Sequence, residues 1–230
     1  MIPNNIKCIG YGAFDRCTGL TSIIVPDGVT KIDYGAFSDC TNLISITIPN
    51  SVTCIGDATF SGCTALTSVT IPDSVISVGC WVFQNCTNLT SVTISNGVTS
   101  IGDKAFYCTG LISVTIPSSV TSIGESAFGY HITFDDGEIK IPNFKIYCYA
   151  GTAGEQYAKD NGFEYEILKE ECSHKLKHIT VPASCTVNGM EYDLCTECGD
   201  TFNSKVIAAL GHSWGNWYIC LLYTSDAADD

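Results

Sequence analysis

The sequence predicts a β-rich solenoid built from stacked repeats of 23 residues. A phenylalanine recurs at spacings of 23, 23, 23, 23 and 22 residues, and a cysteine follows each of the first five. Apolar residues occupy matching positions in every unit. Fixed periods of this length mark repeat architectures, in which a unit buries its apolar stripe only against its neighbours. The two series are Phe14, Phe37, Phe60, Phe83, Phe106 and Phe128, and Cys17, Cys40, Cys63, Cys86 and Cys108.

Each unit contains one short strand with a single buried face. The recurring Val-x-Ile alternates with period two, which is typical of a half-buried strand. A proline ends this strand because it cannot donate to a ladder, although Ser95 takes its place in the fourth unit. A second extended piece leads to Ile-Gly, and Ala-Phe-x-x-Cys then fits a tight helical or 3₁₀ turn. The prolines are Pro26, Pro49, Pro72 and Pro117.

The ladder cysteines are expected to be buried free thiols beside the phenylalanine column. Stacked strands lie about 4.8 Å apart, so each apolar column becomes a continuous rib. A cysteine in such a rib packs as a small hydrophobic residue. The segment Phe106-Tyr107-Cys108 is one residue short, which predicts a locally tightened turn.

The unit Leu-x-x-Val-x-Ile-Pro-x-x-Val-x-x-Ile-Gly-x-x-Ala-Phe-x-x-Cys resembles the leucine-rich repeats of the BspA-like, or Treponema pallidum, type. The resemblance covers roughly residues 2–130. It implies a leucine-rich-repeat solenoid with no catalytic residues in the repeats. It also implies a secreted or cell-surface protein that adheres to host matrix proteins or to other cells.

Four regions are expected along the chain. Residues 1–130 form the solenoid, which we expect to be truncated at its amino terminus, with its signal peptide lost, because Ile2-Pro3-Asn4-Asn5-Ile6 matches the interior of a repeat. Residues 131–168 hold the last degenerate repeat and a carboxyl-terminal cap. Residues 172–219 form a cysteine- and histidine-rich module. Residues 220–230 resemble translated adapter sequence.

The cap is expected to be a small β-α-β unit. A strand is predicted at 144–149 and a closing strand at 163–168. Thr152-Ala153-Gly154-Glu155 has the form of a capping box, and Gly162 that of a helix stop. Tyr157 and Ala158 should face the last coil.

The cysteine-rich module admits three interpretations. The first is a structural zinc site, because Cys-x-x-Cys-Gly offers the thiolates of Cys195 and Cys198 to one metal. The other two ligands would come from Cys172, His174, Cys185 and His212, and the two histidines, His174 and His212, are favoured. The second is a disulfide staple, for example between Cys172 and Cys185. A redox Cys-x-x-Cys would need a thioredoxin-like βαβ context, which this module lacks. The repeats themselves need no cofactor.

The candidate binding surface is a set of hydroxyl rows on the exposed strand positions. These rows also suit solubility and β propensity alone, and they carry no aromatic anchors, which usually mark binding hot spots. The residues are Ser45, Thr47, Ser68, Thr70, Ser91, Thr93, Ser113 and Thr115.

The charge and the absence of known catalytic motifs exclude several classes of partner and activity. The formal charge is −13, with 4 basic and 8 acidic residues in 1–130 and 7 and 16 in the remainder, so neither nucleic acid nor an anionic membrane surface is expected as a partner. The sequence has no apolar stretch long enough to insert into a membrane. It has no Gly-x-Ser-x-Gly, His-Glu-x-x-His or phosphate-binding glycine loop, so we expect no enzyme.

The first hypothesis is therefore an adhesin-like protein that binds host or microbial surface proteins or glycans through its solenoid. The alternative is the non-catalytic repeat region of a larger secreted enzyme, which the full reading frame would reveal. A spacer or an ice-binding solenoid is a third class.

Overall fold

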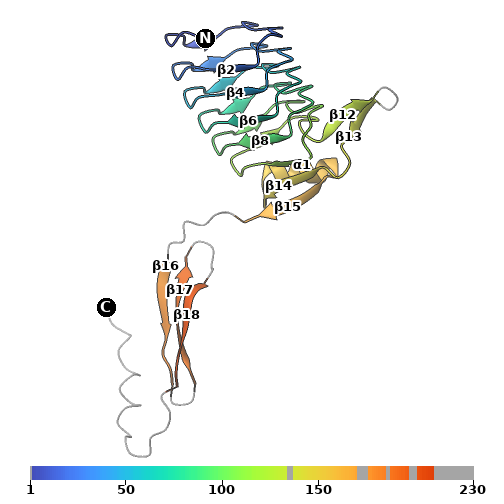
Figure 1. Ribbon diagram of the computed structural model, residues 1–230. Coiled ribbons are helices and arrows are strands. Elements are labelled where there is room, and N and C mark those ends of the chain that lie inside the picture. Colours follow the sequence, from blue (N-terminus) through green and yellow to red (C-terminus); the bar gives the residue numbers. More distant parts are fainter. Residues whose placement is uncertain (1, 134–136, 170–175, 185–186, 197–200, 210–230) are drawn as a thin grey trace, which may run out of the picture. The chain divides into compact units, whose positions relative to one another are not determined.

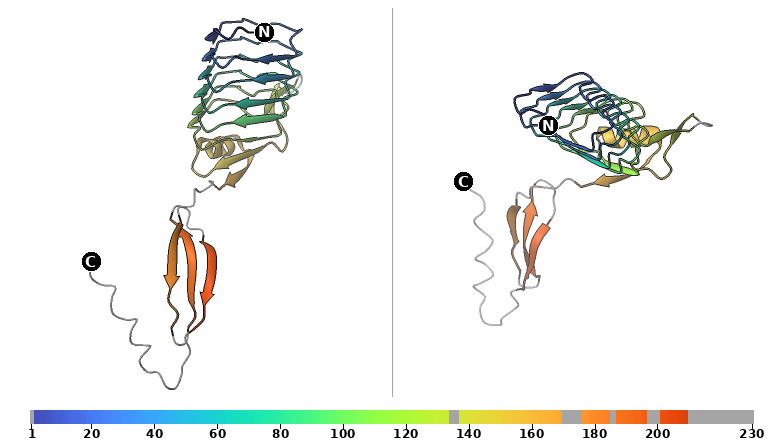
Figure 2. Two further views of the ribbon diagram at one scale, coloured as in Figure 1. Left: turned by 60° about the vertical axis from the view of Figure 1, so that its left-hand side comes forward. Right: turned by 45° about the horizontal axis from the view of Figure 1, so that its top comes forward.

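The computed structural model describes residues 2–133, 137–169, 176–184, 187–196 and 201–209. It divides into two compact units, Met1–Lys169 and Glu170–Asp230. The first unit is a β-solenoid of about seven turns, in which the strands of successive coils lie above one another (Figures 1 and 2). The predicted leucine-rich-repeat solenoid is confirmed.

Two stacks of parallel strands run along the solenoid. The first contains β2 (Ser22–Ile24), β4 (Ser45–Thr47), β6 (Ser68–Ile71), β8 (Ser91–Ile94) and β10 (Ser113–Thr115). The second is one six-stranded sheet of β1 (Cys8–Ile9), β3 (Lys31–Ile32), β5 (Cys54–Ile55), β7 (Ser77–Val78), β9 (Ser100–Ile101) and β11 (Ser122–Ile123). The second stack is paired throughout, whereas the first consists of the pairs β2–β4 and β6–β8 and of β10, which pairs with a later strand. Paired strands are in register one repeat apart, as in Ile46 opposite Ile23.

The prolines end the strands of the first stack, as predicted. Strand β4 stops at Thr47, and the carbonyl of Pro49 then accepts the N–H of Val52 at 3.0 Å. Ser95 keeps this turn without a proline, because its carbonyl accepts the N–H of Val98 at 3.2 Å.

The third side of each coil is a run of tight i→i+3 turns. The N–H of Cys63 donates to the carbonyl of Phe60 at 3.2 Å, but the N–H groups of Ala58, Phe60 and Gly62 donate to the next coil at 2.8, 2.9 and 2.8 Å. Ala58 and Gly62 have left-handed φ values of 52° and 75°. The turns do not continue into a helix because alternate N–H groups hold the coils together.

In the repeat of 22 residues, the missing residue lies further along the chain than the predicted segment Phe106-Tyr107-Cys108. Cys108 has a φ of 55° and donates its N–H to the next coil, as Asn85 does one repeat earlier. Thr109 therefore takes the cysteine position, where it is buried and donates its hydroxyl to the Phe106 carbonyl at 3.0 Å. The missing residue lies between Thr109 and Leu111. The assignment of Cys108 to the cysteine ladder was wrong, because the left-handed residue that binds the next coil must be kept.

The phenylalanine column is the centre of the core. Adjacent rings from Phe14 to Phe128 are stacked with centroids 4.7–5.4 Å apart. The side chains of Phe37, Phe60 and Phe83 are fully buried. Offset stacking of this kind adds to the stability that burial provides.

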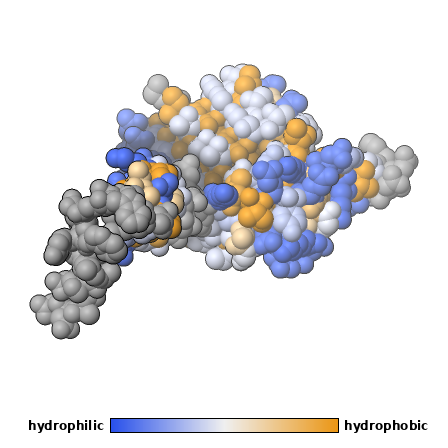
Figure 3. Space-filling model, turned by 90° about the horizontal axis from the view of Figure 1, so that it is seen from below, coloured by the Kyte–Doolittle hydropathy of each residue, from blue (hydrophilic) through white to orange (hydrophobic). Residues whose placement is uncertain are grey.

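The solenoid continues into the predicted cap after a hairpin of β12 (Tyr130–Thr133) and β13 (Gly137–Lys140). Strand β14 (Lys145–Tyr149) pairs in parallel with β10, helix α1 spans Ala153–Asn161, and β15 (Glu164–Leu168) pairs in parallel with β14. The side of the unit that carries these elements has hydrophilic and hydrophobic residues interspersed (Figure 3).

Helix α1 closes the core beneath the last coil. The Tyr157 hydroxyl lies 3.0 Å from both the N–H and the carbonyl of Phe128, and Ala158 is fully buried. Gly162 ends the helix with a φ of 63°. The capping box was wrong in detail: Glu155 accepts the N–H of Gly151 at 2.7 Å, and the Thr152 hydroxyl donates to the Tyr149 carbonyl. The side chains of Thr152 and Glu155 thus both stabilise the turn before the helix instead of capping its first N–H groups.

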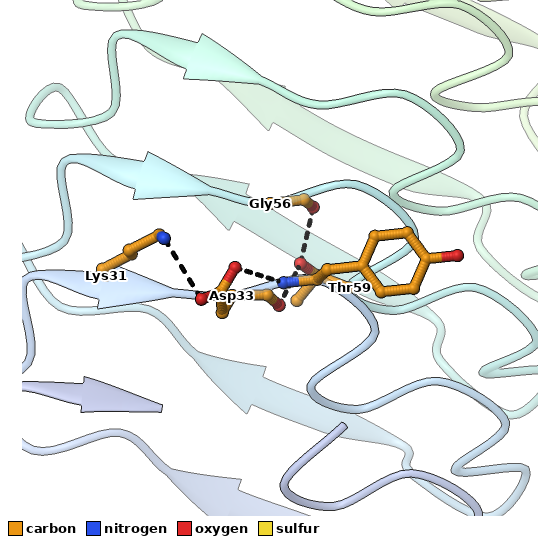
Figure 4. A network of polar contacts seen from close by, with 5 residues as sticks. Lys31, Asp33, Gly56 and Thr59 are labelled. Carbon is orange, nitrogen blue, oxygen red and sulfur yellow. Dashed lines mark hydrogen bonds and ion pairs between the residues drawn. The ribbon is translucent and has the colours of Figure 1, made fainter. Parts of the chain in front are cut away.

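Polar side chains make hydrogen bonds where the strands of the second stack end, both within one coil and to the preceding coil. The Asp33 carboxylate accepts the N–H of Tyr34 at 2.8 Å and the ammonium of Lys31 at 3.1 Å, and both interactions lower its pKa (Figure 4). In the next coil the buried hydroxyl of Thr59 lies 2.6 Å from the Gly56 carbonyl and 3.2 Å from that of Asp33 (Figure 4). A polar residue at this core position is therefore satisfied.

The second unit contains three antiparallel strands, β16 (Leu176–Val181), β17 (Gly189–Cys195) and β18 (Thr201–Ile207). His178 and Asp193 face each other across β16 and β17, with Nδ1 and Oδ1 2.8 Å apart. Asn203 donates to the other oxygen at 2.9 Å, and these two partners lower the pKa of Asp193. The residues 220–230 lie outside the described part of the chain.

Candidate binding face

The hydroxyl rows form one exposed face of the first stack, which we call the hydroxyl face. On β6, Ser68 and Thr70 are exposed while Val69 and Ile71 are buried. The same alternation holds on β4, and Ser113 on β10 is half-buried. Strands β6 and β8 are in register, with Ser91 opposite Ser68 and Thr93 opposite Thr70. The expected orientation of the strands is therefore correct.

The hydroxyl groups of this face are available to a partner. In the described residues, none of the eight predicted hydroxyls has a hydrogen-bond partner within the protein. Hydroxyls elsewhere on the solenoid behave differently. Ser51 and Ser74 each donate to a carbonyl of the preceding coil at 2.6 Å, and Thr53 and Thr99 do so at 3.2 and 3.1 Å. The hydroxyls that bond to a preceding coil therefore contribute to the stability of the solenoid, whereas those of the hydroxyl face do not.

The structure extends the hydroxyl face beyond the repeats. Strand β14 places Lys145 opposite Ser113 and Tyr147 opposite Thr115. Strand β15 continues the two rows with Glu164 and Glu166. The face therefore ends in an aromatic side chain and in charges, which the sequence did not reveal. The signal was the alternation in Phe144-Lys145-Ile146-Tyr147, but its register was hidden by the intervening hairpin.

Lys145, Tyr147 and Glu166 form a compact cluster at this end. The Lys145 ammonium lies 5.0 Å from the centre of the Tyr147 ring and 2.7 Å from the Glu166 carboxylate. The hydrogen bond to Glu166 raises the pKa of Lys145, so the ammonium stays charged at neutral pH. An ordered aromatic side chain beside an ion pair provides a rigid anchor for a binding partner.

Comparison with known proteins agrees with this architecture. Residues 1–71 match the family model described as a BspA type leucine rich repeat region. Residues 1–71 therefore carry leucine-rich repeats of the BspA type. A leucine-rich repeat protein from Bacteroides ovatus, solved by crystallography, is similar over 71% of this chain and 44% of that one, with a TM-score of 0.52 and 24% identity. That protein and this chain share the solenoid fold.

Two further crystal structures are similar to parts of this chain. A leucine rich cell surface protein from Faecalibacterium prausnitzii is 25% identical, over 60% of this chain and 58% of that one, with a TM-score of 0.38. The leucine rich repeat protein of T. pallidum is 21% identical, over 72% and 83%, with a TM-score of 0.43. No curated protein matches the chain. The chain thus spans less than two thirds of the length of the first two structures.

BspA-type repeats form a non-catalytic repeat region suited to protein interaction, and proteins that carry them are typically secreted or held at the cell surface. Over the residues described, no helix is both long and apolar enough to cross a membrane.

The cysteines of the BspA-type repeats are buried only where a coil precedes them. Cys40, Cys63 and Cys86 are fully buried, and each thiol donates to the phenylalanine carbonyl of the preceding coil at 3.0–3.2 Å. Cys17 is exposed, which contradicts the expectation for this position, because in the described residues no coil precedes the one that carries it. Cys108 is half-buried at its different position.

Thiol labelling should separate these cysteines. Burial raises the pKa of Cys40 to about 11 and that of Cys86 to about 12, so both remain protonated thiols at pH 8. A water-soluble maleimide should therefore modify Cys8 and Cys17 rapidly in the native protein, and Cys40, Cys63 and Cys86 only after denaturation. Peptide mapping by mass spectrometry measures each site. Rapid native modification of Cys63 would contradict the burial of this column.

The proposed zinc ligands are only partly within the described structure. Cys195 is buried at the end of β17, with 1% of its surface exposed. Cys198, His174 and His212 lie outside the described residues. Within the described ranges, no group of three or more His, Cys, Asp or Glu residues is placed to hold a metal. The zinc site stays a prediction, and so does the disulfide alternative.

Proposed function

We propose that the chain is an adhesin-like binding module of a secreted or surface-held protein, and that its hydroxyl face binds a partner protein. The observation that carries the proposal is the continuity of this face. Unpartnered hydroxyls occupy the exposed positions of successive strands, and β10, the last of these, pairs in register with the strands that carry Lys145, Tyr147 and Glu166. A repeated polar surface supplies complementarity, and a terminal aromatic anchor supplies the affinity that hydroxyls alone would not.

A protein partner suits the cluster better than a glycan does. Sugar rings stack on an open aromatic face, whereas the Lys145 ammonium already lies over one face of Tyr147. The same ammonium and the Glu166 carboxylate offer charge-assisted hydrogen bonds to a protein surface. Host or microbial surface proteins are therefore the proposed class of partner, and glycans are the second candidate because the hydroxyl rows can bind either.

The test is a binding screen with the full chain on arrays of extracellular-matrix and bacterial surface proteins, with a glycan array in parallel. For the proteins that bind, Thr70→Arg should block the middle of the face, and Tyr147→Ser should weaken binding by roughly tenfold or more, as expected for a hot-spot residue. Ile76→Arg is the matched control, because Ile76 is 57% exposed and lies beside the second stack.

Three results would overturn the proposal. Binding that neither Thr70→Arg nor Tyr147→Ser reduces would place the site elsewhere. Binding to glycans alone would replace the protein partner by the second candidate. An absence of binding on both arrays would favour the alternative in which the repeats belong to a larger secreted enzyme.

A further inference from the structure

A series of main-chain hydrogen bonds along the second stack stops at β11. At each of the five junctions between coils, two carbonyls of one coil accept N–H groups of the next. Thr53 and Gly56 donate to Thr30 and Ile32 at 2.9 and 2.8 Å. At the last junction, Thr121 and Gly124 donate to Thr99 and Ile101, both at 2.8 Å. In the described part of the chain, nothing donates to the equivalent carbonyls of Thr121 and Ile123.

The apolar column beside these carbonyls is also incompletely covered at β11. Ile32, Ile55, Val78 and Ile101 are at most 2% exposed, because the next coil covers each of them. Ile123, the last member, is half-buried. Thr121 and Ser122 are exposed. The edge therefore offers two backbone acceptors and a partly open apolar side chain to a further strand.

Helix α1 does not fill this position. It covers the phenylalanine column through Tyr157 and leaves a groove between itself and β11, lined by Thr121, Ser122 and Ile123 on one side and by residues of 151–160 on the other. On the helix, Lys159 is paired with Glu155 at 2.6 Å. Within the described residues, Asp160 accepts a hydrogen bond from the neutral amide of Gln156 and has no cationic partner. The groove therefore carries a net negative charge.

We infer that this groove binds a short extended peptide of a partner protein, which adds to β11 as a seventh parallel strand. The peptide donates two backbone N–H groups, three residues apart, to Thr121 and Ile123, as every coil does to the one before it. Its inward side chain is a β-branched apolar residue that covers Ile123. A basic residue beyond the paired segment meets the carboxylates of α1. Main-chain bonds of this kind provide affinity, and the alternate side chains provide specificity.

The probe is a synthetic peptide with the sequence Val-Thr-Ser-Ile-Gly-Lys, blocked at both ends, whose first five residues repeat those of residues 98–102. Titrated into the full ¹⁵N-labelled chain, it should shift the amide signals of residues 121–124 and 151–160. The matched control carries N-methyl groups on its threonine and glycine, which remove the two donors. It should bind roughly tenfold more weakly, the loss expected for two hydrogen bonds.

Two variants of neutral, exposed residues complete the test. Gln156→Arg places a cation in the groove and should abolish peptide binding, whereas Asn50→Arg, in a turn between the stacks, should leave it unchanged. Equal binding of both peptides, or shifts centred on β1, would overturn the inference. So would no binding at millimolar peptide. Concentration-dependent sedimentation of the chain alone, lost in Gln156→Arg, would replace the peptide by a second copy as the occupant.

Discussion

Phe60→Ala is expected to lower the free energy of unfolding by roughly 3–5 kcal/mol, the usual cost of removing a buried aromatic side chain. Phe60 is fully buried, and its ring stacks on Phe37 and on Phe83, with both centroids 5.4 Å away. Its loss opens a cavity between two neighbouring coils at once. The coils cannot close over this cavity, because main-chain hydrogen bonds on three sides hold their spacing.

Chemical denaturation followed by circular dichroism measures the effect. Thr70→Ala is the control, because Thr70 is exposed on the hydroxyl face and should change the stability by no more than about 0.5 kcal/mol. The two positions lie in consecutive repeats near the centre of the solenoid, so both changes are measured well away from its ends. Equal destabilisation by both substitutions would mean that the phenylalanine column is not the centre of the core.

Gly102→Ala should destabilise the solenoid by about 1–3 kcal/mol, the range for overpacking a rigid site. A Cβ at this position would lie 2.6 Å from the nitrogen of Cys80 and 2.7 Å from the carbonyl carbon of Gly79. These are backbone atoms of the preceding coil, so no flexible side chain can move to accept the methyl group. The two coils would have to separate, which would lengthen the hydrogen bond from Gly102 to Val78, now 2.9 Å.

Gly10→Ala is the matched control, because Gly10 occupies the same position of the repeat and a Cβ there meets nothing within 4 Å. Its substitution should leave the denaturation midpoint nearly unchanged. The difference between the two variants isolates the close approach of neighbouring coils from the intrinsic cost of alanine. A similar loss in both would assign the effect to local backbone preference.

The sequence pattern predicts part of the hydroxyl face but not its end. The alternation Ser-Val-Thr-Ile predicts which side chains are exposed, because the period of a strand is two and one side must be buried. It does not predict that Tyr147 belongs to the same rows. Tyr147 follows Thr115 by 32 residues, and the hairpin of β12 and β13 takes up the excess over one repeat. Only the pairing of β14 with β10 assigns this register.

The repeat period alone was enough to establish the solenoid, its buried columns and the ends of its strands, because identical units can bury their apolar positions only by stacking in register. The exceptions depend on contacts between coils. Cys17 is exposed while Cys40 is buried, and Cys108 leaves the ladder, because the covering coil and the left-handed turn decide their environments. The open edge of β11 likewise follows from where α1 packs. The spacing of residues along the chain does not show which side chains a neighbouring coil or helix covers, because that depends on how the elements pack in the tertiary structure.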